Sequence, residues 1–316
     1  MFWSKKAEAK PLGVPLGDLQ ALLAPTSIRA KVDGNTLIAR HEHCAVRVEV
    51  VPPGHRESDN GPIRAVVRVL AELPAPMRVL FEPFDAQSAG AWNGFAALGA
   101  LYADGSAVRV GSRLTIYEAE DAWAALHLPL LLFATICGSE AIAGALRRTL
   151  AQQETRGGVS HWGEHDFEHA GRMLSRLCAC THDGGGLTAE FALRDGAVSA
   201  AAGDRQTALF QLMADQPHPE LGGGLFCLLQ MPHRVGNEDR LHRICAQLNA
   251  MEMAPHDLPP HFGAWCPGRL GDNPAYVSFL PNALHAVAGI ALNVAIWAMH
   301  RAQWAAAMLA AMGVRS

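Results

Sequence analysis

Charge is scarce in this chain, and neither sign dominates. Only 18% of the 316 residues are charged, and 26 Lys and Arg face 30 Asp and Glu, which gives a net charge of -4. The arginines are scattered among acidic residues, so the sequence offers no basic field that could follow a phosphate backbone. We therefore expect no nucleic-acid partner. Half of the residues are hydrophobic, which excludes a disordered chain.

The motifs of common enzyme classes are also absent. No nucleophile elbow, P-loop or dinucleotide fingerprint occurs in the sequence. The glycine triplets at 184–186 and 222–224 do not open a helix with the spacing that phosphate binding requires, so we interpret them as loop and bulge glycines. Ser112 and Ser278 lie in β-type runs without a recognisable His-Asp partner. The sequence therefore predicts no catalytic residues, no cofactor and no enzymatic activity.

Signals for export, disulfide bonding and membrane insertion are missing as well. The N-terminus turns charged at once and lacks the apolar core of a secretory signal. The seven cysteines are odd in number and lie mostly in apolar runs, which favours reduced thiols in a cytoplasmic protein. The apolar stretches 126–137 and 283–299 are too short or contain polar residues such as His285 and Asn293. We expect two buried helices there and no integral membrane protein.

The sequence does contain an internal repeat. The first half has Gly-Ala at 99–100, a turn at Asp104-Gly105, a β-type run with Ser112-x-Leu114, and then an apolar stretch over 122–150. The second half repeats this order with Gly-Ala at 263–264, a turn at 267–268, a run with Ser-x-Leu at 278–280, and an apolar stretch over 283–312. We therefore predict a flexible leader over 1–14 and two domains, at 15–152 and 159–316, related as an internal pseudo-dimer.

The elements expected in the first half are mostly strands. Asp33-Gly34-Asn35 separates two β-rich runs between Ile28 and Val51, which is a strong hairpin signal. Runs rich in Val and Leu predict further strands over 63–73 and 77–81, and a short helix is expected over 84–98.

The second half alternates helices and strands more clearly. A helical stripe predicts a helix over 164–178, and a second helix is expected over 238–251, with Asn237 as its N-cap. Four strands are expected between these helices, at 187–193, 197–201, 208–213 and 225–231. The second helix is followed by a hairpin around the turn at 267–268 and by the final helix. This order predicts an α+β fold of two tandem sandwich domains, each an antiparallel sheet packed by helices.

The second half also carries a family resemblance. Asn249 near the end of the middle helix, Trp265 in the next strand, the run Tyr276-Val-Ser-Phe-Leu-Pro281 and the long closing helix together resemble the YbjN-like proteins. Those proteins are similar in fold to type III secretion chaperones. The resemblance covers about residues 160–312 well and 15–150 more loosely, and its motifs are structural. It implies a small α+β sandwich that binds a protein or peptide along its sheet and helices, without a catalytic apparatus.

Two histidine clusters are candidate metal sites. His161, His165 and His169 are four residues apart, so any adjacent pair lies on one helix face within reach of one metal ion. A polar helix face with acidic residues near its start is the alternative interpretation. His41 and His43 share a face of a predicted strand, whereas Cys44 points the other way, and a solvent-facing edge is the alternative there.

Three hypotheses for function follow from these patterns. The preferred one is a non-enzymatic protein that binds a protein or peptide partner through a sheet edge or the apolar helices. The second is a metal-binding protein or metal-dependent hydrolase that uses the His161 helix. The third is an assembly subunit whose long apolar helices form a homodimer or larger oligomer, with Trp297 and Trp304 as candidate interface residues.

Overall fold

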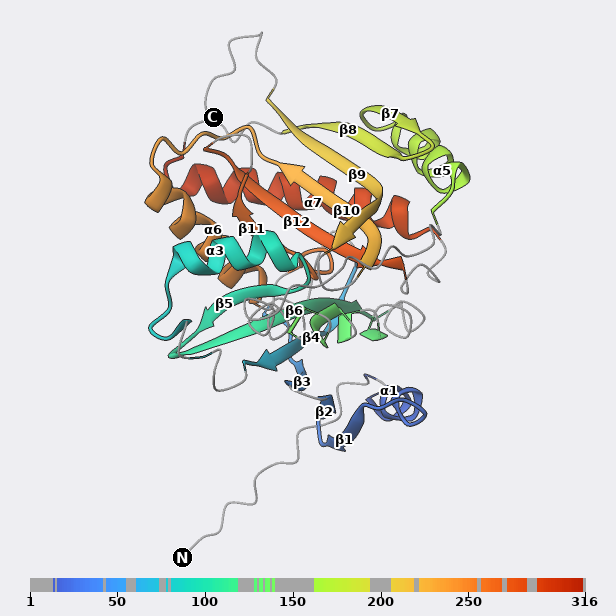
Figure 1. Ribbon diagram of the computed structural model, residues 1–316, viewed down its shortest axis with the longest axis vertical. Helices are drawn as coiled ribbons and strands as arrows, with labels where there is room; N and C mark the ends of the chain where they lie inside the picture. The colour runs from blue at the N-terminus through green and yellow to red at the C-terminus, as the bar shows by residue number, and fades with distance from the viewer. Residues whose placement is uncertain are drawn as a thin grey trace, which may run out of the picture.

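Two antiparallel sheets of six strands each form the framework of the computed structural model (Figure 1). The structure describes most of residues 14–314. Between 119 and 161 it describes only 128, 129, 131, 132, 134–136, 138 and 139. The other residues left out are 15, 42–43, 55–60, 74–77, 79–80, 194–205, 219–221, 255–256, 269–271 and 283–288.

The first sheet has the strand order β1-β2-β3-β4-β6-β5. Its strands are β1 (Arg29–Asp33), β2 (Thr36–His41), β3 (Cys44–Val51), β4 (Ile63–Glu72), β5 (Ala100–Asp104) and β6 (Ala107–Tyr117). The predicted hairpin is confirmed, because Asp33 pairs with Thr36 across a turn in which Gly34 has a φ of 57°. Helix α1 (Leu16–Leu23) precedes the sheet, and α3 (Ala86–Ala96) lies between β4 and β5.

The second sheet has the order β11-β12-β10-β9-β8-β7. Its strands are β7 (Ala179–Asp183), β8 (Gly186–Ala192), β9 (Thr207–His218), β10 (Gly222–Gln230), β11 (Ala264–Pro267) and β12 (Pro274–Pro281). The helices are α5 (Glu164–Leu174), α6 (Glu238–Glu252) and α7 (Ile290–Ala311). Asn237 caps α6 as predicted, since its side chain accepts a hydrogen bond from the backbone N–H of Arg240 at 2.8 Å.

The two halves repeat one arrangement. Each runs through a helix, four strands, a second helix and two more strands, and the fifth and sixth strands exchange places in both sheets. The predicted α+β tandem architecture is therefore confirmed.

Helices cover the inner face of each sheet, and alternating strands supply the core. Strand β3 buries Val46, Val48 and Val50 and turns the intervening residues outward. They pack with α1 and with the helical residues described between 128 and 139, such as Leu131. In the second half, α5 and α7 cover the corresponding face over a core that contains Phe167. The described part of the chain has no helix long and apolar enough to span a membrane.

A pair of buried asparagines shows how closely the halves correspond. The amide of Asn93 on α3 donates to the carbonyl of Leu101 at 3.1 Å and accepts from its N–H at 2.7 Å. The amide of Asn249 on α6 makes the same two bonds with Trp265, at 2.9 and 2.8 Å. Leu101 and Trp265 are the third residues of the two Gly-Ala motifs. The repeat therefore extends to the hydrogen bonds that attach each middle helix to its following strand.

The segments before β5 and β11 join the two halves reciprocally. The N–H of Phe279 on β12 donates to the carbonyl of Ala97 at 2.8 Å, and the N–H of Arg113 on β6 donates to the carbonyl of His261 at 2.9 Å. Ala97 and His261 each precede their Gly-Ala motif by two residues, so these bonds are equivalent. Helix α3 also packs on α6 and β11, which places it between the two sheets (Figure 1).

Some predicted elements differ from the structure or lie outside the described residues. The strand expected at 77–81 is wrong: Arg78 and Phe81 are helical, and the N–H of Glu82 donates to the carbonyl of Arg78. A short apolar run cannot be assigned to a strand or a helix by periodicity alone. Helix α5 ends at Leu174, so Cys178 lies outside it, and the following strand β7 was not predicted. The leader 1–14 except residue 14, the strand at 197–201 and the segment 153–158 between the domains lie outside the described residues.

Candidate functional site

We call the face of each sheet that turns away from its own core the outer face. The strand registers of the two sheets match, so their outer faces can be compared residue by residue. Ser112 pairs with Val69 in the first sheet, and Ser278 pairs with Cys227 in the second. The neighbouring pair Glu49 and Arg68 on β3 and β4 therefore corresponds to Met213 and Phe226 on β9 and β10.

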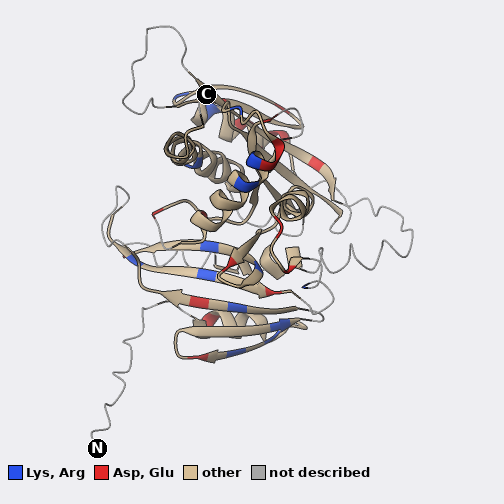
Figure 2. Ribbon diagram, turned by 90° about the vertical axis from the view of Figure 1, so that its left-hand side faces the viewer, with Lys and Arg blue, Asp and Glu red and all other residues tan. Residues whose placement is uncertain are grey.

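The outer face of the first sheet carries ion pairs. Glu49 binds Arg68 at 2.8 Å and Arg47 at 2.8 Å, and Arg109 lies 3.1 Å from Asp104. Burial lowers the pKa of Arg68, whereas the hydrogen bond with Glu49 raises it. The net result is a pKa above the ordinary value of arginine. Figure 2 shows basic and acidic positions along the strands of the first sheet, whereas the strands of the second sheet carry few. The side chains of these ion pairs are 16–42% exposed, so the charges of this face pair with one another at a partly exposed surface.

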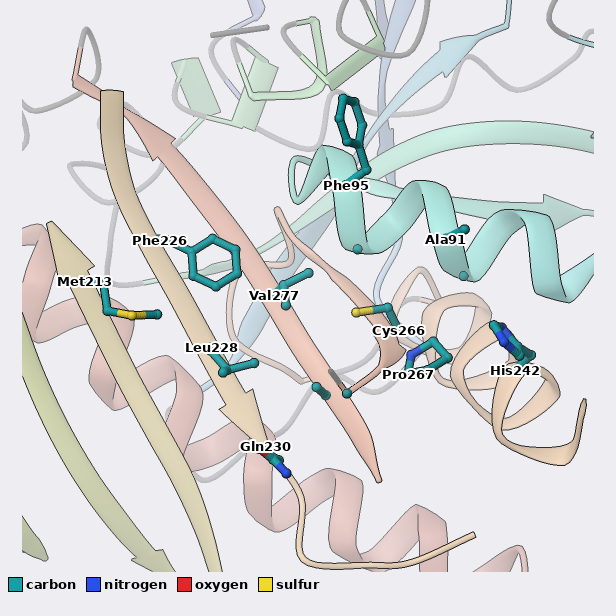
Figure 3. Close-up of a pocket in the computed structure, with 14 residues that line it drawn as sticks. Ala91, Phe95, Met213, Phe226, Leu228, Gln230, His242, Cys266, Pro267 and Val277 are labelled. Atoms are coloured by element: carbon teal, nitrogen blue, oxygen red, sulfur yellow. The ribbon is translucent and has the colours of Figure 1, made fainter. Parts of the chain in front are cut away.

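The equivalent face of the second sheet is apolar and concave. A cavity of about 550 Å³ lies between this face and α3. We call it the groove. Its walls are drawn in Figure 3, with α3 along one side and the strands opposite. It is lined by Gly90, Ala91, Gly94 and Phe95 of α3, by His242 of α6, by Gly268 after β11, and by Met213, Phe226, Leu228, Gln230, Cys266, Pro267, Ala275 and Val277 of the sheet. Its volume lies in the range of about 300–1,000 Å³ that is typical of ligand sites.

The groove is open because small residues replace large ones. On the first sheet, Tyr102, Leu70 and Met253 form a buried cluster over the same region. Cys266 stands at the position of Tyr102, since each is the fourth residue of its Gly-Ala motif. The cysteine sulfur points toward the middle of the groove (Figure 3). No side chain equivalent to Met253 lines this cavity. The same backbone thus leaves space in the second half that side chains fill in the first.

Glycines bring α3 close to the second half along one wall. A methyl group on Gly90 would come within 2.6 Å of Nδ1 of His242 and 3.3 Å of Pro267. A methyl group on Gly94 would lie 3.5 Å from the sulfur of Cys266. The four-residue spacing puts both glycines on the same side of the helix. Larger residues at Gly90 would push α3 outward and change the width of the groove.

One end of the groove is polar. The side chain of His242 is 10% exposed, and its Nδ1 has no hydrogen-bond partner among the described residues. Its Nε2 lies 3.9 Å from a carboxylate oxygen of Glu238, one turn earlier on α6. Asp85, the N-cap of α3, lies within electrostatic range of the same imidazole. The pKa of Asp85 is lowered, chiefly by hydrogen bonds from Ser88 and to a smaller extent by His242.

A buried charge cluster lies where the two halves meet. Arg301 of α7 donates two hydrogen bonds to Glu252 of α6, at 2.7 and 3.0 Å, and Nδ1 of His261 lies 3.1 Å from the same carboxylate. Trp265 also donates to this carboxylate at 2.8 Å. Arg113 of the first half donates to the backbone carbonyl of Glu252. All of these residues are at most 2% exposed.

Burial and mutual attraction set the protonation of this cluster. Burial alone would raise the pKa of Glu252, but Arg301 and His261 hold it well below its usual range. Burial lowers the pKa of His261 despite the adjacent carboxylate, and it lowers the pKa of Arg113 to about 10. Burial opposes ionisation of Arg301 too, yet Glu252 raises its pKa above the ordinary value. The cluster therefore contains an ionised Glu252 between two arginines and a neutral His261.

The cluster fixes the segment that leads into β11. Arg113 donates to the carbonyl of Pro259 at 3.0 Å, and Arg301 donates to that of Pro260 at 2.9 Å. At the equivalent junction on the other side, Ala96, Ala97 and Phe279 take the places of Glu252, His261 and Arg113. Because the charges are buried and bonded to one another and to the backbone, we interpret the cluster as a lock between the halves.

Two of the three predicted metal residues, His165 and His169, lie on α5. His165 and His169 are both exposed, and Nδ1 of His165 lies 3.7 Å from Glu168. His161 lies outside the described residues. Within the described part of the chain, no group of three or more His, Cys, Asp and Glu side chains is arranged to hold a metal ion. The metal site that includes His161 stays a prediction.

The remaining predicted residues are placed as follows. Trp297 is 6% exposed and packs edge-on against Phe262, and Trp304 is half-buried against the same core. His41 pairs with Cys44 across the β2–β3 turn, and His43 is outside the described residues. Ser112 and Ser278 are both buried. The six described cysteines form no disulfide.

Sequence reasoning missed the groove. Its residues come from α3, α6 and four strands, which are far apart along the chain. One signal was present: once the Gly-Ala motifs are aligned, Tyr102 falls opposite Cys266. The correspondence of Arg68 with Phe226 requires the strand pairings, because these residues lie at different distances from the motifs in the two halves.

The chain matches no protein-family model, no curated protein and no solved structure. The resemblance to YbjN-like proteins and secretion chaperones therefore stays a prediction from sequence.

Proposed function

We propose that this protein is a non-enzymatic binding protein that holds an apolar segment of a partner protein in the groove between α3 and the second sheet. The observation that carries the proposal is the contrast between equivalent faces. Positions occupied by the ion pair Glu49–Arg68 in the first sheet are occupied by Met213 and Phe226 in the second. An apolar sheet face beside a cavity is a typical site for another protein.

The shape of the groove favours a peptide segment. It opens along a sheet face, and half-buried side chains such as Met213, Phe226 and Leu228 line it. Burying such side chains is worth about 25 cal/mol for each Å² of apolar surface removed from water. A few apolar side chains of a partner can therefore provide the binding energy without any catalytic group.

The test is a selection of random displayed peptides on the immobilised full chain, compared with the variant Met213→Glu/Phe226→Arg. This double variant transfers to the second sheet the pair that binds at 2.8 Å in the first. We expect peptides rich in Leu, Ile, Phe and Met to bind the wild type and to lose about tenfold or more in affinity with the variant, because a desolvated ion pair replaces apolar contacts.

The matched control is Glu49→Gln/Arg68→Gln, which removes the charges from the first sheet and leaves the groove intact. It should bind the selected peptides as the wild type does. Circular dichroism and urea unfolding establish that each variant is folded. Failure to select any peptide, or equal affinity for wild type and M213E/F226R, would contradict the proposal.

A further inference from the structure

The polar end of the groove is negatively charged. Glu238 is the first residue of α6, and its side chain is 79% exposed. Asp85 is the N-cap of α3 and is also exposed. Glu238 lies 3.9 Å from His242, which lines the groove, and Asp85 begins the helix whose Gly90 packs against His242. Two carboxylates from two different helices are therefore gathered around one end of an apolar cavity.

Helix stability accounts for part of this arrangement. Carboxylates at helix N-termini stabilise the helix by themselves. Asp85 accepts backbone hydrogen bonds from Ser88 at 2.8 Å and from Gln87 at 3.4 Å. A carboxylate has about four acceptor positions, so capacity remains on its solvent side. Helix capping accounts for acidic residues at the two helix N-termini, but it does not account for the position of both N-termini beside the groove.

Among the described residues, neither Asp85 nor Glu238 forms an ion pair with a lysine or arginine. The nearest arginine along α6, Arg240, donates instead to the carbonyls of Met312 and Gly313 beyond the end of α7. In addition, Nδ1 of His242 is buried without a hydrogen-bond partner among the described residues. Both carboxylates therefore remain free to pair with a cationic side chain from a bound segment.

We propose that the segment bound in the groove carries a lysine or arginine next to its apolar residues, and that Asp85 and Glu238 receive this basic side chain beside His242. The inference rests on the proposed function and specifies the chemistry of the partner. In Figure 3, apolar residues line the length of the groove, and His242 of α6 lies at one end. Complementary charge at the edge of an apolar contact supplies orientation and specificity.

The experiment uses three fluorescent, end-capped peptides that share the apolar core Leu-Phe-Leu and differ at the residue beside it, on either side: Lys, norleucine or Glu. Norleucine keeps the aliphatic stem of lysine and removes its charge. At low salt we expect the Lys peptides to bind about threefold to tenfold more tightly than the norleucine peptides, and the Glu peptides to bind most weakly. The preference should shrink with added salt.

Variants locate the effect. Glu238→Gln and Asp85→Asn should each reduce the Lys preference, and the asparagine preserves the helix cap. Glu164→Gln is the control, because Glu164 is likewise exposed and is the first residue of its helix, α5, of which no residue lines the groove. It should leave the preference unchanged.

The outcomes separate this inference from the proposed function. Equal affinity for Lys, norleucine and Glu peptides, all of it lost in M213E/F226R, overturns the basic partner and leaves apolar binding intact. A Lys preference that survives in E238Q and D85N also overturns the assignment of these carboxylates. If no member of the series binds, while selected peptides do not bind either, both proposals are wrong.

Discussion

The outer faces of the two sheets have the same strand order and register but opposite surface chemistry. On the first, Glu49 and Arg68 form an ion pair and Tyr102 packs with Met253. On the second, Met213, Phe226 and Cys266 line a groove. The difference shows that this sheet tolerates either chemistry on its outer face, since the inner face and the helices on it carry the core. Surface chemistry can thus differ between the halves while the fold is kept in both.

The junctions between the halves differ in the same way. One contains the buried cluster of Glu252, Arg301, His261 and Arg113, and its equivalent contains Ala96, Ala97 and Phe279. Here Glu252 of the second half stands where the first half has Ala96, so the asymmetry is not a general loss of charge from one copy. The predictions below test each of these contrasts.

The largest effect is expected at the charged junction. Glu252→Gln removes the negative charge between two buried arginines and should lower the free energy of unfolding by about 3–5 kcal/mol, because it leaves uncompensated buried charge. Urea unfolding followed by circular dichroism measures the change. Glu49→Gln is the control on the partly exposed ion pair, with an expected cost of at most about 1 kcal/mol. Equal losses in the free energy of unfolding for Glu252→Gln and Glu49→Gln would show that the buried cluster stabilises the fold no more than the partly exposed ion pair does.

Acid should act on the same junction. The pKa of His261 lies below 6.5 in the folded protein, so the unfolded state takes up this proton first and stability falls as the pH drops below about 6.5. The pKa of Glu252 is also depressed, so its contribution, present above pH 4.5, is lost as the pH falls toward the folded value. Both effects have the same sign.

Urea midpoints between pH 8 and pH 4 check this dependence. His218 and His233, whose pKa values burial lowers as well, contribute in the same direction. His261→Gln should therefore flatten the decline between pH 7 and pH 5 without removing it. A midpoint independent of pH over this interval in the wild type would contradict a neutral, buried His261.

The twin asparagines should behave alike. Asn93→Ala and Asn249→Ala each leave a buried N–H and carbonyl of the following strand without partners, which should cost about 1–3 kcal/mol. Thermal or urea unfolding of the two variants gives the comparison directly. Similar losses sharpen the correspondence between the halves, whereas a silent substitution in one half would mean that its helix is held by other contacts.

The smallest change in stability is expected when the apolar pair is moved to the first sheet. Glu49→Met/Arg68→Phe exchanges a partly exposed ion pair for apolar side chains and should alter the free energy of unfolding by no more than about 1 kcal/mol. Its consequence is a new apolar surface, which binding of an apolar fluorescent dye detects. The groove is unchanged and its peptides should bind as before. Unaltered dye binding would show that the face alone does not suffice and that the cavity beside α3 is required.

Much of the fold could be predicted from local patterns. Asp33-Gly34-Asn35 predicted a hairpin, Asn237 predicted the start of α6, and the paired Gly-Ala motifs predicted the repeat. These signals work because turn and cap conformations depend on adjacent residues. The segment at 77–81 failed because five residues carry too little periodicity to separate strand from helix.

The site could not be predicted in the same way. Arg113, Glu252 and Arg301 come together from three elements, and on β6 Arg113 has the spacing of an outward polar residue. His165 and His169 were prominent in the sequence through their spacing, yet the structure places them on an exposed helix face. The groove exists because no large side chain fills the space beside Cys266. The absence of a side chain produces no motif that can be recognised in the sequence.

The joining of both copies in one chain has a genetic consequence. In a symmetric homodimer of identical subunits, each codon specifies two positions, so replacing Glu49 and Arg68 by apolar residues would expose two such faces and replacing Glu252 would affect both junctions at once. In this chain each position has its own codon. One copy can then accumulate substitutions that suit recognition while the other keeps those that suit solubility, and selection acts on the two separately.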